Sequence, residues 1–253
     1  QPFAKQVIDE SFLPEADRKI KPDTKFGGIA GGKKYHQGMQ LFKFAEDVEH
    51  SGGFLYGGQT RNDRLAMKSA GHELKSAQAL IDAGVTQLNY PMMAVFTYRG
   101  KRILCMSILP VKGKATLVQG KDNIKDKIKV PPPHIEEVMA LMGANLFIRK
   151  SRKPVGEEIY GPFDMEIHLG LDGLLYMIEA ARLFPPEYHG KAMGNNRFYQ
   201  LLRPEILRKA GKMVHPDVVQ SWDEEGCNDL LEVAAVLDQE IAVLTRELNA
   251  GQH

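Results

Sequence analysis

The segment 161–179 constrains the fold of this chain most strongly, because its pattern predicts a β-hairpin with one acidic face. Apolar residues alternate with Asp164, Glu166 and His168, so the two sets would point to opposite sides of a strand. Asp172-Gly173, between apolar runs, predicts a two-residue turn, which fixes the register of the hairpin. Counting back from this turn places Glu166 opposite Glu179.

Two carboxylates that face each other across a hairpin repel unless a cation or a proton lies between them. Mg²⁺ takes one or two carboxylates together with substrate phosphates, so Glu166 and Glu179 are candidate magnesium ligands. The alternative is a solvated polar face from which both side chains point into water. The hairpin alone does not choose between the two.

The composition is that of an ordinary globular protein, with 253 residues, 43% hydrophobic and 26% charged. The net charge of +1 gives no bulk electrostatic attraction to nucleic acid. The lysine-rich stretch 112–129 has no interleaved aromatic residues, so it predicts a solvated loop rather than a base-stacking surface.

The two cysteines, Cys105 and Cys227, have neither zinc-site nor disulfide-framework spacing, which predicts a reducing, cytoplasmic environment. No apolar run approaches the roughly 20 residues of a membrane span, and no signal peptide is visible. Because the first residue is Gln1 rather than Met, we expect the chain to be a fragment or a processed product.

The order of the predicted elements divides the chain into four parts. Residues 1–22 form a leading helix and a linker, and residues 23–110 a strand-rich part with one helix over 63–83, capped by Asn62 or Asp63. Residues 111–133 connect to a mostly helical part, 134–253, which carries the acidic hairpin and a last helix over 228–249. The predicted class is α+β, and this order is that of a two-lobed, protein-kinase-like fold: an antiparallel-sheet upper lobe with one helix, above a helical lower lobe with a β-hairpin.

Such a fold needs a strand lysine at the phosphates and a helix glutamate that holds it. Lys43 lies between apolar residues of a predicted strand, and Glu73 lies on an alanine-lined face of the predicted helix. A buried carboxylate needs a cation, so we predict a Lys43–Glu73 ion pair. The alternative for Lys43 is an edge-strand lysine whose alkyl chain covers apolar surface while its amine reaches water.

The remaining roles have candidates in the same order. Gly28, Gly31 and Gly32 would cover the phosphates of ATP, Leu109 would contact the adenine, and Asp164 would act as general base. The glycines lack both common phosphate-loop spacings, so an ordinary loop is the alternative. Neither His-Arg-Asp nor Asp-Phe-Gly occurs, which argues against an ordinary protein kinase.

Several ordered blocks between residues 26 and 223 resemble the Clu (clustered mitochondria) domain. They are Leu-Phe-Lys-Phe-Ala at 41–45, Ala-Gly-His-Glu-Leu-Lys at 70–75, Tyr-Pro-Met-Met-Ala at 90–94, Tyr-Arg-Gly at 98–100, Ser-Ile-Leu-Pro at 107–110, Thr-Leu-Val-Gln-Gly at 116–120, Asp-Met-Glu-Ile-His at 164–168, Asp-Gly at 172–173, Ala-Arg-Leu-Phe-Pro-Pro-Glu at 181–187 and Tyr-Gln-Leu-Leu-Arg-Pro-Glu at 199–205. The resemblance implies a large cytoplasmic protein tied to mitochondrial distribution and messenger RNA binding, of which this chain would be one domain.

The acidic hairpin is also similar to that of inositol polyphosphate kinases and of the succinocarboxamide synthase of purine synthesis. That resemblance implies that an acidic strand and a following carboxylate bind metal and nucleotide. Clu domains usually have Asp where this chain has Glu179, and the kinases have Lys near the position of Glu166.

Two functions therefore stay open. One is an ATP- and Mg²⁺-dependent phosphotransferase, or a degenerate relative of one, with an unknown acceptor. The other is a non-catalytic module that binds RNA or a protein partner associated with ribosomes or mitochondria. Nucleotide binding that depends on a metal would separate them.

Two structural expectations accompany these functions. Arg182 and Arg203, each in an apolar block next to proline, should be partly buried and should hold carboxylates or backbone carbonyls. Apolar residues of the last helix recur at spacings of four and three, which predicts either self-association or docking on the chain's own body. They are Leu230, Ala234, Leu237, Ile241, Leu244 and Leu248.

Overall fold

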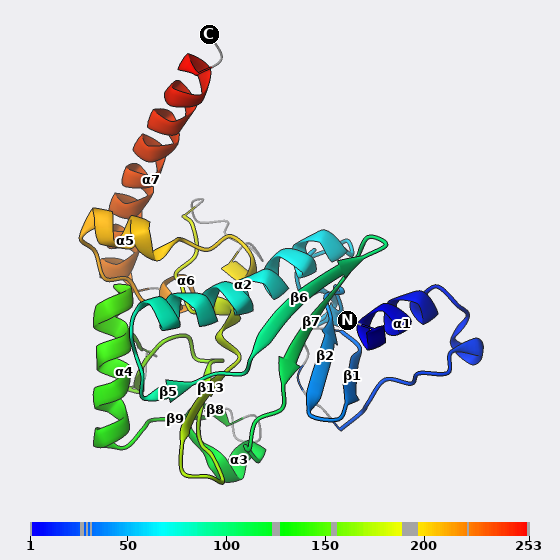
Figure 1. Cartoon of the computed structure of the whole chain (residues 1–253). Helices are drawn as coiled ribbons and strands as arrows, with labels where there is room; N and C mark the ends of the chain where they lie inside the picture. Colours follow the sequence, from blue (N-terminus) through cyan, green and yellow to red (C-terminus); the bar gives the residue numbers. More distant parts are fainter. Residues whose placement is uncertain are drawn as a thin grey trace.

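The computed structural model confirms an α+β protein (Figure 1) and describes residues 2–25, 28, 30, 32–122, 127–152, 156–188, 197–221 and 223–251. Two larger sheets, of four and five strands, lie side by side, and each has its own hydrophobic core. Among the described residues, no helix is long and apolar enough to cross a membrane.

The first sheet is antiparallel, with strand order β1-β2-β7-β6. Its strands are β1 (Lys34–Gln37), β2 (Gln40–Phe44), β6 (Met93–Tyr98) and β7 (Lys101–Ser107). Helix α1 (Pro2–Ser11) buries Ala4, Val7 and Ile8 against one face of this sheet. Phe42 and Phe44 point to that face, so Lys43 between them must point to the other.

Helix α2 (Asp63–Asp82) lies on the face to which Lys43 points. It begins where the Asn62 side chain accepts a hydrogen bond from the Leu65 amide (3.4 Å), as the sequence predicted. Helical spacing predicts a buried stripe of Leu65, Ala70, Leu74, Ala77 and Ile81. Of these only Ala77 is buried and Ile81 is exposed, because small and polar residues face inward. The side chains that are buried are Ala66, Ser69, His72, Glu73, Ser76, Ala77 and Leu80.

The second sheet has the order β5-β13-β12-β8-β9, with β5 (Leu88–Asn89) parallel to β13 (Leu175–Ile178). Strand β12 (Glu166–Leu169) forms the expected hairpin with β13. Strands β8 (Leu117–Asp122) and β9 (Lys127–Lys129) come from the lysine-rich stretch, where a loop was expected. That expectation is wrong because Leu117 and Ile128 bury their side chains once β8 pairs with β12.

The second core lies between this sheet and the helices that follow it. Helix α4 (Pro133–Leu146) contributes Ile135, Met139 and Met142, and α7 (Glu224–Ala250) contributes Leu230 and Val233. The remaining elements are η1 (Glu15–Asp17), β3 (Glu49–His50), β4 (Gly53–Phe54), α3 (Gly113–Thr116), β10 (Lys150–Arg152), β11 (Glu158–Tyr160), η2 (Ala180–Arg182), α5 (Pro204–Ala210) and α6 (Val218–Ser221).

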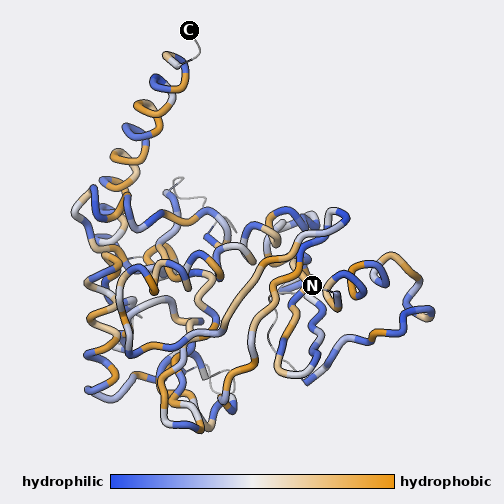
Figure 2. The backbone as a smooth tube through the Cα atoms, in the orientation of Figure 1, coloured by the Kyte–Doolittle hydropathy of each residue, from blue (hydrophilic) through white to orange (hydrophobic). Residues whose placement is uncertain are grey.

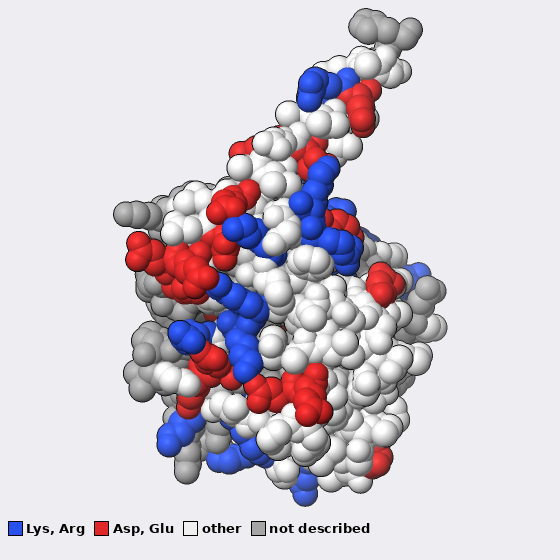
Figure 3. Space-filling view, turned by 90° about the vertical axis from the view of Figure 1, so that its left-hand side faces the viewer, with Lys and Arg blue, Asp and Glu red and all other residues white. Residues whose placement is uncertain are grey.

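The last helix, α7, projects from the body of the protein (Figures 1 and 2). Its first turns dock on the second core through Leu230, whereas Ile241, Leu244 and Leu248 are 52%, 56% and 71% exposed. Charges of both signs are mixed on the face around its base (Figure 3). Lys209 of α5 pairs with Glu240 of α7 at 2.5 Å. The docking alternative therefore holds for the first half of the predicted seam, and the second half stays uncovered.

Candidate functional site

The ammonium of Lys43 lies between two carboxylates that come from distant parts of the chain. Lys43 Nζ is 3.6 Å from Glu73 Oε1 on α2 and donates a hydrogen bond of 3.2 Å to Glu179 Oε1, just after β13. The predicted Lys43–Glu73 ion pair is thus confirmed. Glu179, one of the two candidate magnesium ligands, hydrogen-bonds the same lysine.

Two carboxylates share one lysine at this site, and burial makes that arrangement costly. Burial alone would lower the pKa of Lys43, but the negative charges of Glu179 and Glu73 outweigh it and raise that pKa above its ordinary value. Burial also raises the pKa of Glu73, against the opposing effect of Lys43. Glu73 Oε1 is fully buried and has no hydrogen-bond partner, because the 3.6 Å contact is too long for one.

A cavity of about 40 Å³ lies beside this cluster. It has room for a few water molecules and is far below the ~300–1,000 Å³ of typical ligand pockets. Its walls are Ala30, Lys43, Phe44, Ala45, Glu46, Tyr56, Ala66, Ser69, Ala70, Glu73, Leu104, Glu179 and Ala181.

The register of the acidic hairpin differs by one residue from the prediction. Glu166 lies opposite Ile178 rather than Glu179, because the loop has three residues, Leu171 to Gly173. The Gly170 amide bonds the Leu174 carbonyl (2.8 Å), and only Gly173 within the loop takes a positive φ (+82°). A two-residue turn of type I′ would need a positive φ at the preceding residue as well. The predicted Glu166–Glu179 pair is therefore wrong.

Glu166 instead accepts a hydrogen bond from His168. The buried Nε2 of His168 donates to Glu166 Oε2 at 3.0 Å. His168 Nδ1 lies 3.0 Å from the Thr116 hydroxyl, so the ring is held on both sides by neighbouring side chains. In the part of the chain that the structure describes, no group of three or more His, Cys, Asp or Glu side chains is arranged to hold a metal ion.

Asp164, the candidate base, is held by the guanidinium of Arg182 from η2. Arg182 Nε and Nη2 donate to its two oxygens at 2.8 and 2.6 Å, while Nη1 donates to Asp217 Oδ1 at 2.9 Å. Burial alone would lower the pKa of Arg182, but the charges of Asp164 and Asp217 outweigh burial, so that pKa is raised above its ordinary value. The structural role predicted for Arg182 is confirmed. Arg203 is exposed instead, because the adjacent Leu202 takes the inward position.

The predicted nucleotide contacts that the structure describes do not gather at one place: Gly32 lies beside the Phe44 end of β2, and Leu109 lies beyond the Gln40 end. Gly28 and Gly32 both have positive φ (+88° and +51°), and the Gly28 carbonyl accepts a hydrogen bond from Lys34 Nζ (2.8 Å). A Cβ on Gly32 would lie 3.3 Å from the Phe44 carbonyl oxygen. Gly31 lies outside the described residues. Leu109 is half-buried in the connection after β7.

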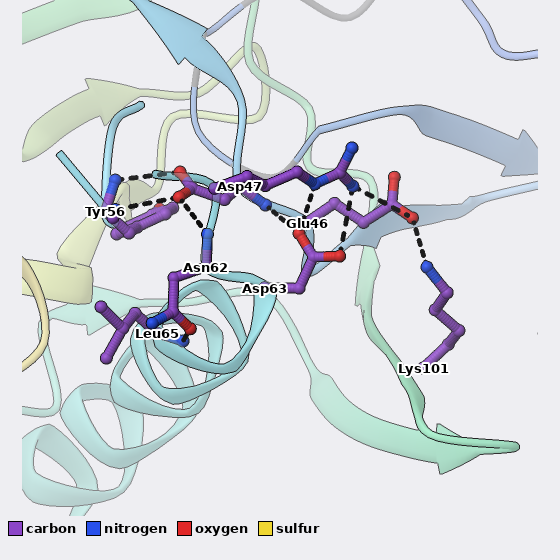
Figure 4. A network of polar contacts seen from close by, with 9 residues as sticks. Glu46, Asp47, Tyr56, Asn62, Asp63, Leu65 and Lys101 are labelled. Carbon is purple, nitrogen blue, oxygen red and sulfur yellow. Dashed lines mark hydrogen bonds and ion pairs between the residues drawn. The ribbon is translucent and has the colours of Figure 1, made fainter. Parts of the chain in front are cut away.

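Sequence reasoning missed Asp47, which organises the loop before α2 (Figure 4). Its carboxylate is 3% exposed and accepts three backbone hydrogen bonds of 2.9 Å, from the amides of Tyr56, Gly57 and Asn62. Its own amide donates to Asp63 Oδ1 at 2.9 Å. These bonds fix the first turn of α2 and therefore the helix that carries Glu73. No local signal marks Asp47, because its partners lie 9 to 16 residues away.

The family model for clustered mitochondria proteins matches residues 1–189, a range that holds every residue of the Lys43 cluster and the Asp164–Arg182 pair. The chain belongs to the clustered mitochondria family. The match includes α1 and β1 through β13 and stops before α5, so it starts and ends earlier than the blocks at 26–223 suggested. No curated protein and no solved structure matches the chain significantly.

Proposed function

We propose that this clustered mitochondria domain is an ATP- and Mg²⁺-binding module with a two-lobed, kinase-like fold, and that it is a phosphotransferase or a degenerate relative of one. The observation that carries the proposal is the convergence of Lys43, Glu73 and Glu179 at one cavity. They come from a strand, the next helix and the end of a later hairpin, which is the order that a kinase-like phosphate site uses.

In this proposal Lys43 contacts the phosphates, Glu73 orients it, and Glu179 binds the metal. Two carboxylates and one lysine leave a negative charge at the cavity when all three are ionised, and a divalent cation would compensate that charge. A nucleotide needs more room than the cavity offers, so binding requires Glu179 to leave Lys43. Its side chain is 43% exposed, which makes this the cheaper of the two ion pairs to break.

The alternative is a non-catalytic module that binds RNA or a protein partner. Three observations favour it: the cavity is small, Asp164 is held by Arg182 at both oxygens, and Glu166 bonds His168 rather than facing Glu179. In that case the Lys43 cluster serves as a structural tie between the first sheet, α2 and the end of β13.

Calorimetric titration with ATP, with and without Mg²⁺, separates these two functions. We expect binding only in the presence of the metal, a loss of binding in Lys43→Met, and unchanged binding in Lys101→Met. Lys101 is the matched control, because it lies in the same sheet and does not itself line the cavity; it pairs with the wall residue Glu46 at 3.0 Å. At a hundredfold excess over Kd, ATP with Mg²⁺ should stabilise the wild type by about 2.7 kcal/mol.

Glu179→Gln provides a second test that does not depend on a buried residue. It removes one of two charges that share Lys43, so it should leave the melting temperature of the nucleotide-free protein equal or slightly higher while weakening the binding of Mg²⁺ with ATP. Identical nucleotide affinity in Glu179→Gln and wild type, or no binding in either, would favour the non-catalytic module.

A further inference from the structure

A second and larger cavity lies on a different face of α2, away from Lys43. It is a groove of about 350 Å³ between α2, the end of α4 and the segment that leads into α5, and this volume falls within the range of small-molecule sites, ~300–1,000 Å³. Its walls are His72, Lys75, Ser76, Gln78, Ala79, Asp82, Ala83, Asn145, Leu146, Phe184, Leu201, Leu202, Arg203, Pro204, Glu205 and Arg208.

The floor of the groove is apolar, and the side chains of His72 and Asn145 there are already hydrogen-bonded. Leu146, Phe184 and Leu202 are buried side chains of the second core that reach the groove. Asn145 Nδ2 donates to the Ala83 carbonyl at 2.9 Å, and His72 Nε2 donates to the Tyr199 carbonyl at 2.9 Å. Burial lowers the pKa of His72 below its ordinary value; the hydrogen bond to Tyr199 opposes this effect, and Lys75 and Lys68 add to it. The apolar part of a ligand could therefore cover the His72 and Asn145 side chains without depriving them of a hydrogen bond.

The rim is charged, and its cations lack the carboxylate partners that a neighbouring surface lysine has. Lys75, Arg203 and Arg208 line the groove, are exposed, and have no carboxylate within ion-pair distance in the described part of the chain. Arg208 lies over the Phe147 ring at 5.7 Å. By contrast Lys209, next to Arg208, is paired with a carboxylate of α7.

Two carboxylates also line the rim. Asp82 Oδ1 accepts a hydrogen bond from the Gln78 amide at 2.8 Å, and Glu205 lies in the first turn of α5. Three cations against two carboxylates leave the rim with one excess positive charge. The charge favours an anion, and the apolar floor favours a ligand with a hydrocarbon body.

We propose that this groove binds an amphipathic anion, with an apolar chain or ring system on Phe184 and Leu202 and a carboxylate or phosphate head at Lys75 and Arg203. A free fatty acid and an alkyl phosphate of lipid origin share this chemistry. The site does not depend on nucleotide binding at Lys43, because α2 separates the two cavities.

The proposal is tested by calorimetry on the full chain, below the micelle concentration of each probe. Decanoate and decyl phosphate should bind saturably with a stoichiometry of one, and comparing the two identifies the preferred head group. Inorganic phosphate, which lacks the apolar body, should not bind. Decyltrimethylammonium, which has the same chain and the opposite charge, should bind at least about tenfold more weakly. Equal binding of the cationic amphiphile overturns the assignment of an anion.

Two variants locate the site. Lys75→Glu with Arg203→Glu changes only exposed positions and should weaken decanoate about tenfold or more. Arg64→Glu is the matched control, because Arg64 is exposed on the same helix and does not line the groove, and it should leave the affinity unchanged. Ala79→Phe fills the floor and should abolish binding. If both groove variants bind decanoate like the wild type, the groove is not the site and the proposal fails.

Discussion

Lys43→Met is the substitution with the most informative consequence for stability. It replaces the ammonium with a thioether of similar length, so packing in β2 changes little. Glu73, which is 5% exposed, then keeps a buried carboxyl without its cation, and its Oε1 already lacks a hydrogen bond. The loss of Lys43 costs less free energy at Glu179, because its side chain is 43% exposed and water can solvate the charge.

The size of the effect follows from the proton that Glu73 must take up. Burial raises the pKa of Glu73 and Lys43 opposes that rise, so without Lys43 the folded state must either bury an unpaired carboxylate or bind a proton more tightly than the unfolded state does. Removing one member of a buried ion pair costs ~3–5 kcal/mol. The wild type already carries part of this cost, so we expect Lys43→Met to lose about 3 kcal/mol.

The sign of the pH dependence follows from the direction of the shift. The pKa of Glu73 is raised in the folded state, and loss of Lys43 raises it further. A carboxyl group whose pKa is higher in the folded state stabilises that state below the unfolded pKa of 4.5. This stabilisation is lost as the pH rises through the folded pKa. The deficit of Lys43→Met should therefore be largest at neutral and higher pH and become smaller as the pH falls toward 4.5.

Urea unfolding followed by circular dichroism between pH 5 and pH 8 measures this deficit. Glu73→Gln is the partner variant: Lys43 keeps Glu179, so it should stay within about 1 kcal/mol of wild type. The double variant Lys43→Met/Glu73→Gln should recover most of the loss, because no buried carboxyl remains unpaired. A double variant as unstable as Lys43→Met, or a deficit independent of pH, would refute the reasoning.

Three further outcomes are expected from the same assay and from sedimentation. Arg182→Ala leaves Asp217 buried without its cation and should cost about 3–5 kcal/mol, whereas the exposed Arg203→Ala should not change the melting temperature; equal effects would contradict the difference in burial. Asp47→Ala removes the acceptor of three backbone amides, one of them in a fully buried hydrogen bond, and should cost at least about 2 kcal/mol. A loss below about 1 kcal/mol would argue against the role of Asp47 before α2. Ile241→Glu in the exposed half of α7 should leave stability unchanged while abolishing self-association of the full chain at high concentration; a monomeric wild type removes the self-association prediction.

The local sequence determined which residues could form the Lys43–Glu73 pair. Alternation placed Lys43 on the strand face opposite its two phenylalanine neighbours, and helical spacing placed Glu73 among alanines. Both patterns repeat within a few residues, and a buried carboxylate on one element needs a cation on the next. The helix cap at Asn62 could likewise be predicted from the sequence, because its partner, the Leu65 amide, is three residues away.

The tertiary structure decided where Glu179 lies. One additional residue in the hairpin loop moved Glu166 out of register with it, and an offset of one residue reverses the face of every side chain in a strand. Strand β8 and the role of the Asp47 carboxylate could not be predicted from the sequence either, because their partners are distant in sequence and create no local pattern. The sequence by itself therefore determined the elements and the first ion pair. Only the packing of these elements determined that a second carboxylate completes the cluster, since its position depends on the exact length of a loop and on long-range contacts.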